Sequence, residues 1–188
     1  WQIDTLITTL SIAGNNLENE SISSSLICLI AQCPQLHAYI VHKLYQTVSE
    51  DTSQQALVHV AVWCFGEYGQ LLIQPPPQDE SLKDGQDAPS GTQVIDIVSK
   101  CMRLHYATEV TKSYCLNAFL KLTTRFADQP QLQGRLLKLV RAYQHSMRLE
   151  LQQRSVEYMN LLKDDWTSLR PEVLAQMPVI DEEKLKAK

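Results

Sequence analysis

Apolar residues recur along most of the chain at a spacing of three or four positions, which places them on one face of an α-helix. Ile3, Leu6, Ile7 and Leu10 form the first such stripe. The same periodicity predicts nine helices, over residues 1–13, 19–31, 35–49, 53–72, 91–104, 108–126, 130–145, 149–163 and 166–176. We therefore expect an all-α fold.

One stretch is ambiguous because it alternates and carries β-branched residues. This stretch, "LVHVAVW" (57–63), lies inside the apolar run 53–72. Strands are usually shorter than about ten residues. The run is twice that length, which favours a helix. Since it is apolar almost all round, the helix is expected to be buried.

Prolines mark where the helices start or are absent. Pro34, Pro130 and Pro171 each precede or open a periodic segment, as helix-start prolines do. Four others lie in the polar segment 74–91, which has no periodicity and is predicted to be a loop. A loop of this length is often disordered. It is either a solvated insertion or a regulated or partner-binding segment.

The predicted helices repeat in pairs. The second, fourth, sixth and eighth are centred near Leu26, Trp63, Ala118 and Glu157. The first and last intervals are each nearly forty residues, and the middle one becomes similar once the loop is removed. A two-helix unit with this period is typical of HEAT and armadillo arrays. We therefore expect an α-solenoid of stacked antiparallel helix pairs.

Composition narrows the classes of function. The chain is 44% hydrophobic, which allows a buried core, and its net charge of −4 argues against a nucleic-acid partner. Five scattered cysteines within apolar stretches indicate reduced, buried thiols in a cytosolic protein. Cys28 and Cys33 have no second ligand pair at zinc-like spacing, so no metal site is expected.

The stretch 61–72, "AVWCFGEYGQLL", has the most unusual residues. Cys64 lies within the predicted helix, and His59, five residues before it, is on a different face of that helix and cannot activate the thiol. A small buried apolar role for Cys64 is therefore favoured over a nucleophilic one. Glu67, if buried, needs a partner, which we expect to be an Arg or Lys of the next repeat or the backbone of a neighbouring helix. The alternative for Glu67 is a contact with another chain. The residues assigned to packing are Trp63, Cys64, Gly66, Glu67, Tyr68 and Gly69, the two glycines allowing another helix to approach closely.

A second polar group lies in "ELQQRSVEYM" (150–159). Arg154 is spaced to pair with Glu150 and Glu157 on the same helix. Leu151, Ser155 and Tyr158 can face inward. The alternative is a subunit interface, where Arg and Tyr are enriched. Its candidate residues are Gln152, Gln153, Arg154, Glu157 and Tyr158.

Signatures of catalysis and of cofactor binding are absent from the sequence. The five histidines are dispersed and none has HExxH spacing, Gly14 lacks the Lys of a phosphate loop, and there is no G-x-S-x-G. We therefore expect no enzyme activity and no cofactor. An enzyme using Cys64 or Glu67 stays as the alternative.

Several blocks resemble the gamma-adaptins, in family order and over most of the chain. The run "SQQALVHVAVWCFGEYGQLL" (53–72) is the most specific of them, because alpha-adaptin differs there. "ELQQRSVEY" (150–158) is shared with alpha-adaptin. Gln70 and Ser155 depart from the family pattern, which indicates a divergent member. The other matching blocks are "WQIDTLITTLSIAG" (1–14), "LHAYIVHKLY" (36–45), "LKLTTRF" (120–126) and "QMPV" (176–179).

This resemblance implies a large subunit of a clathrin adaptor complex that supports cargo sorting and coated-vesicle formation. The implied partners are a beta-adaptin, a mu medium chain and a sigma small chain. An Arf-family GTPase, clathrin and the membrane would be reached through the whole complex. The implied location is cytoplasmic, peripheral on the trans-Golgi network, endosomes and clathrin-coated vesicles. A generic HEAT-repeat scaffold, a transport-receptor segment and an alpha-adaptin are the alternatives.

The resemblance also sets the expected domain limits. Residues 1–180 would be the C-terminal segment of an adaptin trunk, and residues 181–188 the start of a flexible hinge. The chain does not open with Met, and we expect it to be part of a longer protein.

Overall fold

The structure, a computed structural model, describes residues 1–16, 20–77 and 87–178. These residues form α-helices and short 3-10 turns, and no strand occurs among them. The all-α prediction is confirmed. The helices are α1 (Gln2–Ala13), α2 (Glu20–Ala31), α3 (His37–Glu50), α4 (Gln55–Leu72), α5 (Gly91–Arg103), α6 (Glu109–Arg125), α7 (Pro130–Arg141), α8 (Leu149–Leu161) and α9 (Arg170–Val173).

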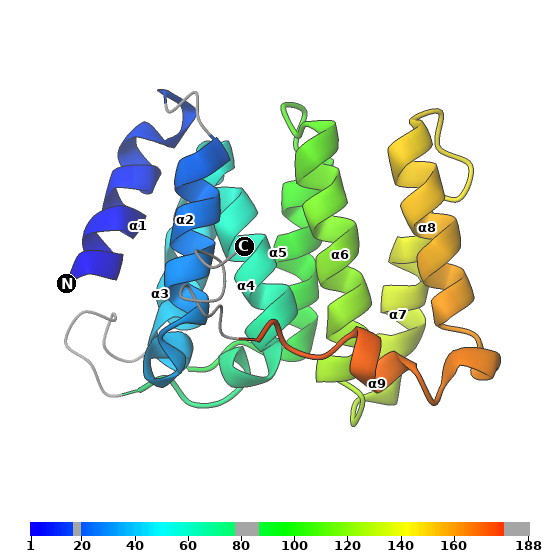
Figure 1. Cartoon of the computed structure of the whole chain (residues 1–188). Helices are drawn as coiled ribbons and strands as arrows, with labels where there is room; N and C mark the ends of the chain where they lie inside the picture. Colours follow the sequence, from blue (N-terminus) through cyan, green and yellow to red (C-terminus); the bar gives the residue numbers. More distant parts are fainter. Residues whose placement is uncertain (17–19, 78–86, 179–188) are drawn as a thin grey trace, which may run out of the picture.

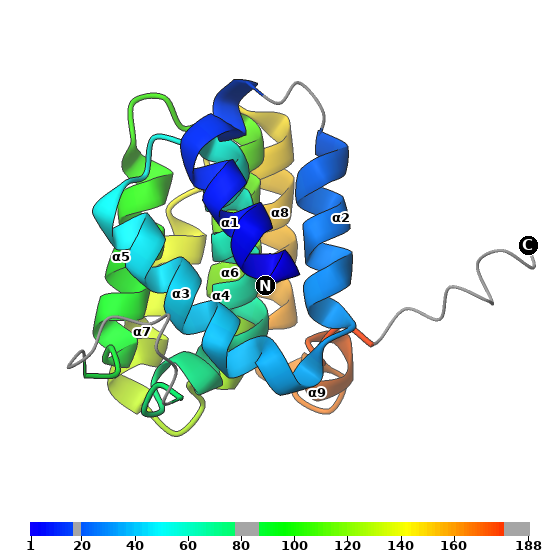
Figure 2. The same ribbon diagram turned by 90° about the vertical axis from the view of Figure 1, so that its left-hand side faces the viewer.

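The first eight helices stack side by side as antiparallel pairs (Figure 1). Turned by 90°, α3, α5 and α7 form one layer on the left and α4, α6 and α8 lie beside it in the middle, with α2 farther to the right (Figure 2). Each pair buries its apolar faces against its neighbours. This arrangement is the HEAT/armadillo-like solenoid that the forty-residue period predicted.

Local sequence signals fix several helix starts. Ser90 caps α5, accepting a hydrogen bond from the Gln93 amide while the Gln93 side chain accepts one from the Ser90 amide. The Thr108 side chain accepts a bond from the Thr111 amide at the start of α6. Pro130 opens α7, where the missing amide proton costs nothing. These signals fix where the helices of the third pair and the first helix of the fourth pair begin.

The core is centred on α4, which includes the stretch 57–63 and is helical throughout it. Val58, Ala61, Val62 and Phe65 are fully buried. This helix lies between α3 on one side and α6 on the other, with α2 against it as well. Burial all round explains why its sequence shows no polar face.

The seventh and ninth predicted helices are shorter than expected. The seventh ends at Arg141 rather than 145, and the ninth, predicted over 166–176, is reduced to α9 and a 3-10 turn at Asp164–Trp166. Trp166, Leu169 and Val173 are exposed, so no apolar stripe packs this segment against the rest. Without such packing a short helix is unstable in water.

Two expectations fall wholly or partly outside the described residues. Of the loop 74–91, residues 74–77 and 87–90 are described and are non-helical, and α5 begins at Gly91. Residues 78–86 and the proposed hinge 181–188 are not among the described residues.

Membrane-spanning potential is low in the described helices taken singly. None of them is long and apolar enough to cross a bilayer. The segments 22–31 and 34–50, which meet at a bend of 96°, meet the length and composition criteria only when taken together.

Candidate functional site

Glu67 is the only carboxylate that is buried in the part of the chain that the structure describes. It lies near the end of α4 and faces α6, where its Oε1 accepts a bond from Nζ of Lys121. Its Oε2 lies 3.6 Å from Nη2 of Arg125. The Arg125 Nε also donates to the backbone oxygen of Glu67, at 3.0 Å. Two cations from the next helix pair therefore compensate one buried carboxylate.

The segment after α9 returns to the same point. It runs back along the lower edge of α6 toward α4 (Figure 1). Nη2 of Arg125 donates to the backbone oxygen of Leu174 at 3.0 Å, and the Gln176 side chain donates to the backbone oxygen of Glu67 at 3.3 Å. The Met177 amide donates to Oε2 of Glu67 at 3.4 Å. We call Glu67, Lys121 and Arg125 the ion cluster, because they join α4, α6 and the chain segment 174–177.

Two glycines let α4 and α6 approach closely at this cluster. A Cβ at Gly66 would lie 2.9 Å from Cα of Ala118, and one at Gly69 would lie 2.6 Å from Cδ2 of Leu122. The first of these contacts is with backbone, which cannot rotate away. The absence of a side chain at Gly66 therefore sets the distance between the two helices.

Aromatic residues surround the end of α4. The backbone of Tyr68 leaves helical geometry (φ −120°, ψ 20°), which bends the helix at that residue. His37 stacks on the Tyr68 ring with centroids 3.9 Å apart, and Trp63 meets it edge-on. Burial raises the pKa of Tyr68 to about 12. The phenol therefore stays protonated and acts as a packing group.

Cys64 does not have the environment of a nucleophile. It is fully buried, and burial raises the pKa of its thiol far above the ordinary value. His59 instead contacts Thr111 at 2.8 Å and stacks on Tyr114. A thiol that is neither accessible nor ionised at neutral pH cannot attack a substrate.

Helix α8 carries the second group of candidate residues. Nε of Arg154 donates to Oε1 of Glu150 at 2.6 Å, and its Nη1 lies 3.2 Å from the Tyr158 hydroxyl. Both Arg154 and the Tyr158 hydroxyl also donate to Oδ1 of Asn117 on α6. This network fixes Arg154 and Tyr158 against the neighbouring helix pair.

The other candidates on α8 lie nearer to solvent. Gln153 and Glu157 are exposed and joined by a hydrogen bond of 2.9 Å, while Gln152 is half-buried. Leu151 and Ser155 point inward, the Ser155 hydroxyl donating to the Val140 oxygen. Because α8 is the last long helix of the described stack, its outer side is not covered by another helix (Figure 1).

A partly enclosed cavity of about 310 Å³ lies between the ion cluster and the α8 network. Its wall is mainly apolar. Its lining residues come from α4, α6, α8 and the C-terminal segment, and include Trp63, Tyr114, Asn117, Lys121, Tyr158 and Leu174. Since the chain's own Leu174 covers one side, the cavity is part of the packing between the repeats.

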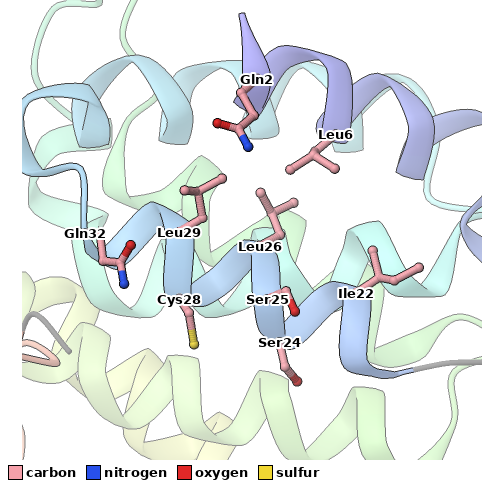
Figure 3. Close-up of a pocket in the computed structure, with 9 residues that line it drawn as sticks. All are labelled: Gln2, Leu6, Ile22, Ser24, Ser25, Leu26, Cys28, Leu29 and Gln32. Carbon is pink, nitrogen blue, oxygen red and sulfur yellow. The ribbon is translucent and has the colours of Figure 1, made fainter. Parts of the chain in front are cut away.

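A larger hollow of about 600 Å³ opens between α1 and α2 (Figure 3). Leu6 of α1 and Leu26 and Leu29 of α2 face one another across it, while Ser24 and Cys28 point away from α1. Nothing in this hollow resembles a set of catalytic groups. No cluster of potential metal ligands occurs within residues 1–16, 20–77 and 87–178 either.

Sequence reasoning named Glu67 but not the residues that bind it. Lys121 and Arg125 are four positions apart, which places them on one face of α6. That pair was the available signal, since a buried carboxylate on α4 needs cations on the helix packed against it. Asn117 and Leu174 carried no comparable signal, because their roles depend on how distant segments meet.

Comparison with known proteins identifies the relatives of this chain. Residues 1–165 match the family model described as "Adaptin N terminal region". The AP-1 complex subunit gamma of Dictyostelium discoideum is 39% identical over 185 residues, which cover 98% of this chain and 20% of the relative. The AP-1 complex subunit gamma-like 2 of Homo sapiens is 35% identical over 182 residues, covering 96% of this chain and 22% of the relative.

An alpha subunit is also similar, but less so. The AP-2 complex subunit alpha of Schizosaccharomyces pombe is 25% identical over 163 residues, covering 87% of this chain and 17% of the relative. The chain thus spans about a fifth of the length of the curated relatives it matches. Identity is higher to the gamma subunits than to this alpha subunit.

Proposed function

The chain belongs to the adaptin N-terminal region family, and we propose that it is a segment of the helical trunk of a gamma-type large subunit of a clathrin adaptor complex. In this role it is a structural scaffold that supports cargo sorting and coated-vesicle formation. The proposed domain limits are 1–180 for the trunk segment and 181–188 for the start of the hinge. No catalytic step is assigned to it.

The observation that carries the proposal is the buried connection between successive repeats. The ion cluster joins α4 to α6, the Asn117 network joins α6 to α8, and the segment 174–177 binds both α4 and α6. Such connections resist sliding of one helix pair over the next. A segment held in this way acts as a rigid arm of the trunk.

The proposed partners are a beta-adaptin, a mu chain and a sigma chain. Association with an Arf-family GTPase, with clathrin and with the membranes of the trans-Golgi network and endosomes would come through the whole complex. A cytoplasmic, peripheral location follows from these partners.

We propose the solvent-exposed part of α8 as the contact with the beta-adaptin. Gln153 and Glu157 are exposed there, and Arg154 and Tyr158 are already fixed by Asn117. Fixed Arg and Tyr side chains lose little entropy on binding, which suits them to interface positions. Gln152 lies on the same turn and completes the surface.

The test is affinity purification of the tagged chain with beta, mu and sigma chains expressed together. Recovery of the beta chain is expected, and it should fall with Glu157→Arg, an exposed position that does not hold the fold. Arg154→Glu and Tyr158→Ala should reduce recovery further. Glu172→Arg on α9 is the control, because Glu172 is also exposed and the substitution changes the charge by the same amount.

The possible results test the proposed contact on α8 and the adaptor assignment separately. If the beta chain is recovered equally with all variants, the contact is not on α8. If the folded wild-type chain recovers none of the three subunits, the adaptor assignment fails and a generic helical-repeat scaffold remains.

A further inference from the structure

Basic residues are concentrated in one part of the chain. Residues 100–148 contain nine Lys and Arg residues and only two acidic residues, Glu109 and Asp128, a formal charge of +7 in a chain whose net charge is −4. Six of the nine belong to the last turns of α5 and α7 and to the starts of α6 and α8. We call these six the basic patch: Lys100, Arg103, Lys112, Lys138, Arg141 and Arg148.

The topology gathers these six residues at one end of the molecule. Since α5 and α7 run in the same direction and α6 and α8 run back, both helix–helix connections lie at the same end (Figure 1). Nε of Arg148 lies 3.9 Å from Oε2 of Glu109, which joins the two connections. Burial raises the pKa of Tyr143, just after α7, and the charge of Arg103 at the end of α5 opposes that shift.

Most of the patch has no compensating acid. Of the six, Arg148 alone has an acidic side chain within salt-bridge distance among the described residues. Lys100, Arg103, Lys138 and Arg141 are exposed. Three basic residues outside the patch differ, because Arg125 and Arg170 bind backbone oxygens and Arg135 pairs with Asp96.

Exposed apolar side chains stand beside the patch. Met147 is 99% exposed and Leu149 is 74% exposed, on either side of Arg148, and Val110 is exposed near the start of α6. Cations in the last turn of a helix are stabilised by its dipole, which accounts for Lys and Arg at the ends of α5 and α7. The helix dipole does not explain why large apolar side chains are exposed beside these cations.

We propose that this end of the chain binds the surface of an anionic phospholipid membrane. Clusters of four to eight Lys and Arg residues are typical of proteins that bind anionic lipid headgroups. Met147 lies in the connection between α7 and α8 and Leu149 is the first residue of α8, so both can enter the boundary between headgroups and acyl chains. The arrangement fits a bilayer better than an acidic protein surface, because it offers charge for the phosphates and apolar groups for the layer beneath them.

The inference does not depend on the adaptor assignment, since it rests only on the charge and exposure of these residues. The test is co-sedimentation of the chain with vesicles of phosphatidylcholine alone and with an equal mixture of phosphatidylcholine and phosphatidylserine. The chain should pellet with the mixed vesicles and not with the neutral ones. Binding should weaken as salt is added, because salt screens the exposed charges.

Variants identify the surface that binds. Lys138→Ala with Arg141→Ala should weaken binding roughly 25-fold, at roughly fivefold for each basic residue near an anionic surface. Arg135→Ala with Lys163→Ala removes the same charge from positions outside the patch and should leave binding unchanged. Met147→Ser with Leu149→Ser should reduce the binding that survives at high salt. The substituted side chains are all at least partly exposed, so circular dichroism should show unaltered helices in each variant.

Three results would overturn the proposal. The first is a folded chain that does not bind the mixed vesicles. The second is a loss of vesicle binding in the Arg135/Lys163 control that equals the loss in the Lys138/Arg141 variant. The third is unchanged binding by the Met147/Leu149 variant. If the patch variants lose a protein partner while vesicles are ignored, this end is a protein interface and not a membrane-binding surface.

Discussion

At the scale of single residues, the buried Glu67 carries the most consequence. Bringing a carboxylate and two cations out of water costs free energy that their attraction only partly returns, so the ion cluster adds little net stability. Its value lies in specificity. The cluster is satisfied only when α4, α6 and the segment 174–177 meet in this one arrangement.

Removing the charge of Glu67 should destabilise the chain strongly. Glu67→Gln leaves Lys121 and Arg125 close together without their carboxylate, and we expect the free energy of unfolding to fall by about 3–5 kcal/mol. Urea denaturation of both proteins gives the difference. Glu157→Gln is the matched control, since its carboxylate is exposed and its loss should cost less than about 0.5 kcal/mol. A smaller effect at Glu67 than at Glu157 would contradict this account of the cluster.

Thiol reactivity should divide the five cysteines by burial. Cys64, Cys101 and Cys115 are buried, and burial raises the pKa of each of these thiols, to about 11 for Cys101. Cys28 and Cys33 are partly exposed. Native protein treated with a thiol reagent should be labelled quickly at these two only, and denatured protein at all five. Rapid labelling of native Cys64, mapped by mass spectrometry, would instead favour the enzyme alternative.

At the scale of elements, the contact between α4 and α6 decides how the repeats stack. Adding a methyl group at Gly66 pushes its Cβ against the backbone of Ala118, which overpacks the contact. The same substitution at Gly134 in α7 meets nothing within 4 Å. The two positions therefore separate the close helix approach from the general effect of glycine on helix stability.

Gly66→Ala and Gly134→Ala should change stability in opposite directions. We expect Gly66→Ala to lower the free energy of unfolding by about 1–2 kcal/mol, because overpacking outweighs the gain in helix propensity. Gly134→Ala should raise it by about 0.5–1 kcal/mol. Thermal unfolding of both variants measures the signs. A stabilising Gly66→Ala would mean that α4 and α6 are not held as closely as described.

Periodicity predicted the long helices because packing reinforces what each of them prefers locally. Helix α4 is the clearest case, since its length decided against a strand and its apolar surface is buried all round. The segment 166–176 shows where periodicity fails. Its apolar residues have helical spacing, but only Leu174 is buried, so packing does not sustain a helix there.

The candidate site was predictable only in part. Glu67 stood out because a carboxylate in an apolar helix needs a partner, and Lys121 and Arg125 are spaced to provide one. The bond from the Met177 amide joins residues 110 positions apart. No local pattern encodes a contact of that range, so the C-terminal segment emerged only from the folded chain.

At the scale of the whole molecule, the stacked pairs form an α-solenoid. Each repeat contacts its neighbours, and the described stack ends with α1 on one side and α8 on the other (Figure 1). The curated relatives that it matches are about five times its length, and they include gamma subunits of AP-1 complexes at 39% and 35% identity. The central claim is that this chain performs the same scaffold role within such a trunk.

Exchange of the matching segment tests that claim most directly. The aligned residues of the Dictyostelium gamma subunit are replaced by this chain, and the tagged chimera is purified with its beta, mu and sigma chains. We predict recovery of all three at the level of the unaltered subunit, whereas an unrelated helical-repeat segment of equal length should recover fewer. A folded chimera that fails to recover the other subunits would contradict the account.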